Sequence, residues 1–142
     1  MKTKVISFIL SCIFITSFSH ADGSLVIIGG ALDPENSDIY MKFIELGGGK
    51  GHIKIAIIPA AGSRPVQSGN SYKSDFIRYG VPASRIKIFP IAVKDDPKTI
   101  QLDESKWRGN GNSRAIATEM LTYTAVFFVG GEQLRYRQAL LD

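Results

Sequence analysis

The chain has 142 residues, of which 44% are hydrophobic and 21% are charged, as in ordinary globular domains. This composition argues against intrinsic disorder, and the length leaves room for one domain. The formal net charge of +4 comes from Lys and Arg residues spread along the chain, without the clustered basic stripe that nucleic-acid binding requires.

The first 21 residues differ in composition from the rest of the chain. Lys2 and Lys4 precede an apolar run from Val5 to Phe18, and Ser19-His20-Ala21 places small residues where a signal peptidase reads them. We expect residues 1–21 to be a signal peptide and the protein to be exported, to the periplasm or outside the cell. The alternative is a membrane anchor, but the run is shorter than the roughly 20 apolar residues of a bilayer span. Cleavage would lower the net charge to +2, by the loss of the two lysines, and would remove the single cysteine, which excludes disulfides.

Residues 22–142 alternate short apolar runs with segments of helical periodicity, which predicts an α/β domain with a parallel sheet and right-handed crossovers. Strands are expected at 24–28, 53–58, 85–89 and 125–129, and the apolar runs at 24–28 and 53–58 are typical of buried strands. Helices are expected at 39–46 after an Asn36-Ser37 N-cap, at 72–79, after an N-cap at Ser113, and at 133–141. Pro90 either ends the third strand or places it at a sheet edge. The polar segment 94–111 is expected to be a long loop anchored by Trp107.

The last predicted helix reaches Asp142 without a Gly, a Pro or a polar tail to end it. Four parallel strands without further units would leave an unpaired edge strand and uncovered apolar surface. We therefore expect a truncated chain, the amino-terminal part of a larger domain. The alternative is a complete chain whose exposed half is covered by a partner, for example in a homodimer.

Three turns are candidates for a ligand site, because open α/β sheets bind ligands at the carboxyl ends of their strands. They are Gly29-Gly30-Ala31, Pro59-Ala60-Ala61-Gly62-Ser63 and Gly130-Gly131-Glu132-Gln133. Glycines there let the backbone approach a substrate, and the following helix N-termini present free N–H groups. Each turn also has a simpler interpretation, since glycine pairs after strands are often only tight turns.

The sequence does not match the common catalytic and cofactor motifs. Gly29-Gly30 lacks the spacing of a dinucleotide fingerprint, and Gly49-Lys50 is not followed by the Ser or Thr of a phosphate loop. His52 stands alone at the start of a strand, so no metal and no cofactor is expected. Residues 111–115 almost match the G-x-S-x-G nucleophile elbow, but they follow a polar loop, so Ser113 is expected to cap a helix.

Four segments together resemble the first half of the cyanophycinase family of serine exopeptidases. They are SLVIIGGA at 24–31, IAIIPAA at 55–61, RGNGNS at 108–113 and VFFVGGEQLR at 126–135. The Gly-Gly-acidic-Gln motif at 130–133 is the most specific part, and the related dipeptidase E branch carries a different residue where Gln133 stands. The resemblance covers residues 23–142 and implies a three-layer parallel sandwich, like the class I glutamine amidotransferases and flavodoxin.

The resemblance also implies a serine protease chemistry that cuts cyanophycin, a poly-aspartate chain bearing arginines, to β-aspartyl-arginine dipeptides. Gly131 would lend a backbone N–H to the oxyanion hole, and Gln133 would hydrogen-bond the aspartyl substrate near the cut. Gly130 and Glu132 would complete the substrate-binding motif. The family's serine elbow and histidine would lie beyond Asp142, so the chain alone is not expected to hydrolyse cyanophycin. Two alternatives stay open: a noncatalytic binding or assembly module of the same fold, and another dipeptidase or amidotransferase-like enzyme.

Overall fold

The computed structural model describes residues 23–29 and 31–141. The predicted signal peptide at 1–21 therefore lies outside the described residues, as does Gly30 of the first predicted turn. None of the helices formed by the described residues has the length and apolar character needed to cross a bilayer.

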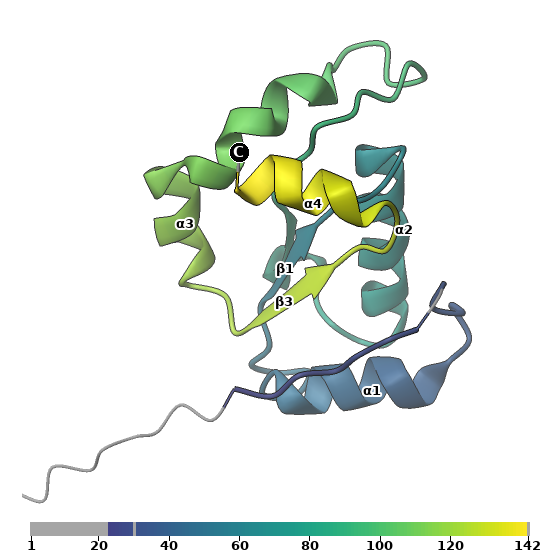
Figure 1. Cartoon of the computed structure of the whole chain (residues 1–142). Helices are drawn as coiled ribbons and strands as arrows, with labels where there is room; N and C mark the ends of the chain where they lie inside the picture. Colours follow the sequence, from purple (N-terminus) through teal and green to yellow (C-terminus); the bar gives the residue numbers. More distant parts are fainter. Residues whose placement is uncertain (1–22, 30, 142) are drawn as a thin grey trace, which may run out of the picture.

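Three strands form one all-parallel sheet with β1 in the centre, in the order β2-β1-β3. Figure 1 shows β1 and β3 side by side. Along the chain the elements are α1 (Ser37–Leu46), β1 (Ile55–Ile58), α2 (Pro65–Arg78), η1 (Ala83–Arg85), β2 (Ile86–Ile88), η2 (Glu104–Asn112), α3 (Arg114–Met120), β3 (Ala125–Phe128) and α4 (Gln133–Leu140). Ile55 of β1 lies opposite Ile86 of β2 and Ala125 of β3. This open α/β architecture confirms the predicted parallel sheet, and it is compatible with a flavodoxin-like fold.

Helices cover both faces of the sheet. Ile55 and Ile57 join a buried cluster with α1 and α2, to which those helices contribute Tyr40, Ile44 and Phe76. Ala56 and Ile58 point to the opposite face, where they pack with residues of α3 and α4. Successive side chains of a strand alternate between faces, so a central strand covered on both sides is apolar at every position. This explains why β1 was predictable from its sequence.

The first helix follows its sequence signals closely. Asn36 Oδ1 accepts a hydrogen bond from the Ile39 N–H at 3.3 Å, which satisfies one of the free donors at the start of α1. The helix ends at Gly47, and the next two residues, Gly48 and Gly49, have φ angles of 110° and 78°. Residues with side chains rarely adopt these angles, so the glycine run ends α1 and turns the chain towards β1.

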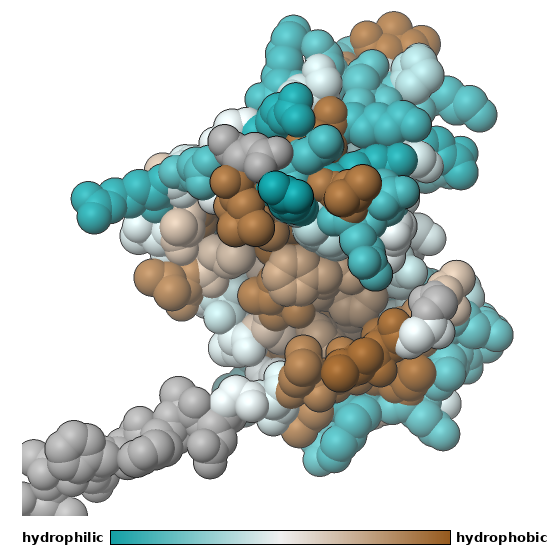
Figure 2. Space-filling view, viewed as in Figure 1, coloured by the Kyte–Doolittle hydropathy of each residue, from teal (hydrophilic) through white to brown (hydrophobic). Residues whose placement is uncertain are grey.

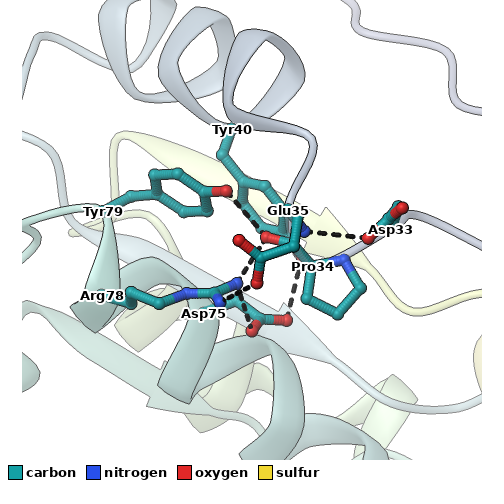
Figure 3. A network of polar contacts seen from close by, with 7 residues as sticks. All are labelled: Asp33, Pro34, Glu35, Tyr40, Asp75, Arg78 and Tyr79. Carbon is teal, nitrogen blue, oxygen red and sulfur yellow. Dashed lines mark hydrogen bonds and ion pairs between the residues drawn. The ribbon is translucent and has the colours of Figure 1, made fainter.

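A polar network fastens the loop before α1 to the end of α2 (Figure 3). The Tyr40 hydroxyl donates to Asp75 Oδ2 at 3.0 Å, and the Arg78 guanidinium contacts Asp75, Glu35 and the Pro34 carbonyl. Burial, followed by the hydrogen bond to Asp75, raises the pKa of Tyr40, which keeps the hydroxyl protonated as a donor. The network fixes α1 against α2 beneath one face of the sheet.

The predicted buried strand at 24–28 is wrong. Leu25 and Ile27 are 82% and 84% exposed, and no residue of this segment pairs with the sheet. The segment is separated from β3 by a groove of about 500 Å³, which both of them line. The described residues therefore form three strands rather than four, and the outer edge of β3 is unpaired among them. An apolar run marks a preference for burial, but it does not specify the partner that a strand needs.

The fourth predicted strand exists as β3 (Ala125–Phe128), and only one of its faces is well buried. Phe127 is buried and contacts three aromatic rings, whereas Phe128 is 54% exposed and Val126 is partly exposed. Helices α1 and α2 cover the face of β3 that carries Phe127, whereas the face that carries Val126 and Phe128 is only partly covered. The strand β2 is the opposite edge of the sheet, as the proline after it suggested.

Two other segments contain more helix than predicted. The expected loop at 94–111 includes η2, whose start is capped by Asp103 Oδ1, which accepts from the Ser105 N–H at 3.1 Å. The helix α2 begins at Pro65, seven residues before the apolar stripe from which it was predicted. Proline suits the first helical position because its φ is already helical and its missing N–H would have no partner there.

Candidate functional site

The turn after β3 lies tightly against the turn after β1. Gly131 has a φ of 149°, and a Cβ atom there would lie 2.2 Å from the Ala61 carbonyl oxygen. The same oxygen accepts a hydrogen bond from the Glu132 N–H at 3.0 Å. Only glycine fits this close backbone approach, so position 131 is constrained both by space and by conformation.

The first turns of α4 clamp the carboxyl ends of β1 and β3 together. The Tyr136 hydroxyl lies 2.9 Å from the Ile58 carbonyl oxygen and 2.7 Å from the Val129 carbonyl oxygen, so it donates across the two strand ends. Arg135 Nη1 donates to the Ala61 carbonyl at 2.7 Å. Burial raises the pKa of Tyr136, so its hydroxyl stays a donor. These contacts hold the 130–133 turn at a fixed height above the sheet.

An open cavity of about 580 Å³ lies at this edge of the sheet. Residues from all three candidate turns line the cavity: Ala31, Ala61, Gly130, Gly131 and Gln133. The turns after β1 and β3 lie at the carboxyl ends of these strands, as predicted, whereas the first turn follows a segment that is not a strand. The remaining lining residues are apolar or aromatic: Ile28, Tyr72, Phe128, Val129 and Tyr136.

No family model matches the chain, and no solved structure matches it. The chemistry of the cavity therefore has to be inferred from its own geometry.

The Gly131 amide belongs to a residue that lines the cavity. No acceptor for its N–H is found in the described residues, although the adjacent Glu132 N–H is paired. A backbone N–H held rigidly beside a cavity can stabilise a negative oxygen without first having to reorganise. Gln133 is the first residue of α4 and is exposed, so its carboxamide can both donate to and accept from a bound ligand.

The other two residues of the motif differ in position. Gly130 lines the cavity beside Gly131 and has no side chain to offer. Glu132 is the N-cap of α4, and its carboxylate turns back to accept from the Leu134 N–H at 3.4 Å. It is not among the residues that line the cavity. Its carboxylate therefore supports the start of α4, where a negative charge also complements the helix dipole.

No serine among the described residues lies on a nucleophile elbow. A nucleophile elbow is a sharp, strained turn, but none of the non-glycine residues at 23–29 and 31–141 has a positive φ. Ser113 caps α3, with its Oγ 3.5 Å from the Ile116 N–H, which confirms the capping prediction. His52 is exposed at the other end of β1, and no cluster of metal-binding side chains occurs among the described residues.

Sequence reasoning missed the two tyrosines of the cavity. Tyr136 lies one helical turn after Gln133, so the three-residue spacing could have placed both on the same side of α4. Tyr72 was assigned only to the apolar stripe of α2. Tyr72 lines the cavity, and its pKa is raised by burial and then by Asp75, so its hydroxyl stays neutral.

Proposed function

We propose that this chain supplies the oxyanion and substrate side of a cyanophycinase-like serine exopeptidase site, in an exported domain with a class I glutamine amidotransferase-like fold. The observation that carries the proposal is the Gly131 turn. It combines an amide without a described acceptor, a position at the carboxyl ends of parallel strands, and Gln133 two residues later beside the same cavity.

In this proposal each residue of the turn has a separate task. The Gly131 N–H donates to the oxygen of the scissile carbonyl as it becomes negative. The Gln133 carboxamide hydrogen-bonds the aspartyl part of a β-aspartyl-arginine unit and so fixes its orientation. Tyr136 and Arg135 contact neither the scissile carbonyl nor the aspartyl part of the substrate. They hold the two strand ends and the Ala61 carbonyl, which keeps the turn in place.

A hydrogen-bond donor accelerates hydrolysis only after a nucleophile has created the negative charge. Since the described residues contain no strained elbow serine, we expect this chain by itself to bind the substrate without cutting it. Incubation of the purified chain with cyanophycin should release no dipeptide above a protein-free blank. Release that disappears in a Gln133→Ala variant would contradict this expectation.

Binding is the direct test of the proposed site. Calorimetric titration with β-aspartyl-arginine dipeptide should show binding that weakens about tenfold in Gln133→Ala, as expected for the loss of one or two hydrogen bonds to a charged ligand. The matched control is Gln101→Ala, because Gln101 is also exposed but lies in the distant loop before η2. Equal affinity in both variants, or no binding at all, would reject the assignment.

A noncatalytic binding or assembly module is the second candidate, and a surface feature favours it. Exposed apolar side chains extend from the segment beside α1 across β3 to the start of α4, where Figure 2 shows a hydrophobic band between hydrophilic regions. Its exposed members include Leu25, Ile27, Val126, Phe128 and Leu134. Apolar patches of this kind often mark protein interfaces. A discrete dimer in gel filtration, together with no dipeptide binding, would support the module over the hydrolase.

A further inference from the structure

An uncharged groove lies beside the free edge of β3. Its volume is about 500 Å³, which is within the range of binding sites. It is lined by residues 23–26 and Ile28, by Phe43 and Leu46 of α1 with the following Gly47, and by residues 124–128. None of these residues carries a charge, so the groove suits an uncharged occupant.

The free edge of β3 presents backbone groups to this groove. The Ala125 and Val129 amides donate to carbonyl oxygens of Lys54 and Ile58, on the side of β1. The backbone groups of successive residues alternate between the two edges of a strand, so those of Val126 and Phe128 turn away from β1. Both residues line the groove. The groove therefore combines apolar side chains with free backbone donors and acceptors, the combination that binds an extended peptide as an added strand.

The segment 23–28 follows the groove in the same direction as β3. Gly23 lines only the groove, as does Thr124 just before β3, whereas Ile28 and Phe128 also line the cavity at the carboxyl end of the strand. Figure 1 shows the segment, in dark purple, passing along α1. The chain that precedes Gly23 therefore joins the described part of the molecule at the end of the groove where β3 begins.

The residues that precede Gly23 suit the groove in chemistry and in length. The amino-terminal run, Val5 to Phe18, contains no charged residue, and only residues 19–22 connect it to Gly23. A four-residue loop is a common hairpin connection, so it is long enough to reverse the chain. The run can then return antiparallel to the segment 23–28 and lie between that segment and β3.

We propose that part of the amino-terminal run, while it is still attached, occupies the groove as an extended segment hydrogen-bonded to the free edge of β3. Its side chains pack against the exposed apolar side chains of Val126 and Phe128, which are 37% and 54% exposed without it. Burial of apolar surface and pairing of free backbone groups both favour this arrangement. It does not depend on the hydrolase proposal, because the residues of the oxyanion turn take no part in it.

Cleavage after Ala21 would end this contact. An unpaired edge strand is a template for pairing with other chains, so the bound run protects the uncleaved chain from such association. Its removal uncovers the edge of β3 and the groove together. Because Ile28 and Phe128 line both the groove and the cavity, removal of the run also opens the side of the cavity that faces the groove.

A second copy of the chain fits the groove less well than the run does. The segment 23–28 lies across the groove from β3, so an occupant has to fit between the two. A single extended segment is thin enough for such a place, whereas the edge of a second folded sheet brings its covering helices with it.

Cys12 is the single cysteine of the chain and lies within the run, so it reports on the place of the run. With residues 19–22 as the connection, residue 18 lies opposite residue 23, and Cys12 lies opposite Gly29, near the carboxyl end of β3. Under mild oxidation of the uncleaved chain, a Phe128→Cys variant should form an intramolecular disulfide roughly tenfold faster than an Ile100→Cys variant, because bridged cysteines need Cα atoms within about 7 Å. Ile100 is the control because it is 95% exposed in the loop before η2. Electrophoresis without reductant measures both rates.

Amide hydrogen exchange tests the pairing itself. In the uncleaved chain the Val126 and Phe128 amides should be protected, and Phe14→Asp, which puts a charge into the run, should lower their protection factors roughly tenfold. His20→Asp is the matched control, since it changes the connection and not the run, and the Val129 amide, which bonds to β1, should stay protected in every variant. The proposal is overturned if the two cysteine variants oxidise at equal rates, or if disulfide-linked dimers of a second copy form instead. It is also overturned if the Val126 and Phe128 amides exchange as fast in the wild type as in Phe14→Asp.

Discussion

Replacement of Tyr40 by phenylalanine removes one oxygen atom from the network of Figure 3 and leaves the aromatic packing in place. Tyr40 is 1% exposed, and its ring lies 5.3 Å from Phe76 and 4.6 Å from Tyr79, contacts that phenylalanine can keep. What is lost is the 3.0 Å hydrogen bond to the Asp75 carboxylate. Such bonds to charged groups contribute about 1.5–3 kcal/mol.

The lower part of that range applies here, because Asp75 keeps its contact with Arg78 at 3.3 Å and its side chain is 14% exposed. We therefore expect Tyr40→Phe to lower the free energy of unfolding by about 2 kcal/mol, or roughly 6–10 °C in melting temperature. Urea titration followed by far-ultraviolet circular dichroism measures this change.

The matched control is Tyr79→Phe. The Tyr79 hydroxyl donates to the neutral Pro34 carbonyl at 2.7 Å in a solvent-exposed bond, so its loss should cost only about 0.5–1.5 kcal/mol. If Tyr40→Phe is as stable as the wild type, or is affected less than Tyr79→Phe, the buried hydroxyl–carboxylate bond does not stabilise the fold as described.

Two further pairs of variants test the packing on either side of the sheet. Gly111→Ala should destabilise the domain by about 1–3 kcal/mol because the new Cβ collides with the Ala139 carbonyl. The control Gly109→Ala should change the stability by less than about 0.5 kcal/mol, since nothing lies within 4 Å of its Cβ position. Thermal unfolding compares the two variants, and equal effects would contradict the close contact between η2 and α4. Phe127→Ala should lower the free energy of unfolding by about 3–5 kcal/mol because the ring is buried among three other aromatic rings. Phe128→Ala should lower it clearly less, because Phe128 is 54% exposed. If urea titration gives the reverse order, β3 faces the core with its other side.

Elements with self-contained signals could be predicted from the sequence. The start of α1 depends on the Asn36 side chain and its end on the following glycines, so local chemistry decides both boundaries. The strand β1 is buried on both faces, and its unbroken apolar run reflects that position. The turns after β1 and β3 meet at one cavity because parallel strands bring their carboxyl ends to a common edge.

Features that depend on distant partners could not be predicted in the same way. The run at 24–28 is apolar like β1, but it lies across a groove from β3 and does not pair with the sheet. Its sequence does not indicate this separation. The segment 94–112 is mostly polar, and nothing in its periodicity indicated that Glu104 would be buried and that η2 would pack on α4. Tyr136 was overlooked since its hydroxyl acts on the Ile58 carbonyl, 78 residues away in the sequence.

The amide signal of Gly131 reports most directly on the proposed site. In a nitrogen-15 spectrum titrated with β-aspartyl-arginine dipeptide, the largest shifts should occur at Gly131 and Gln133, and Gln133→Ala should require about tenfold more dipeptide to produce them. No shift at these amides, or shifts centred near His52 at the opposite end of β1, would mean that the turn after β3 is not a substrate site.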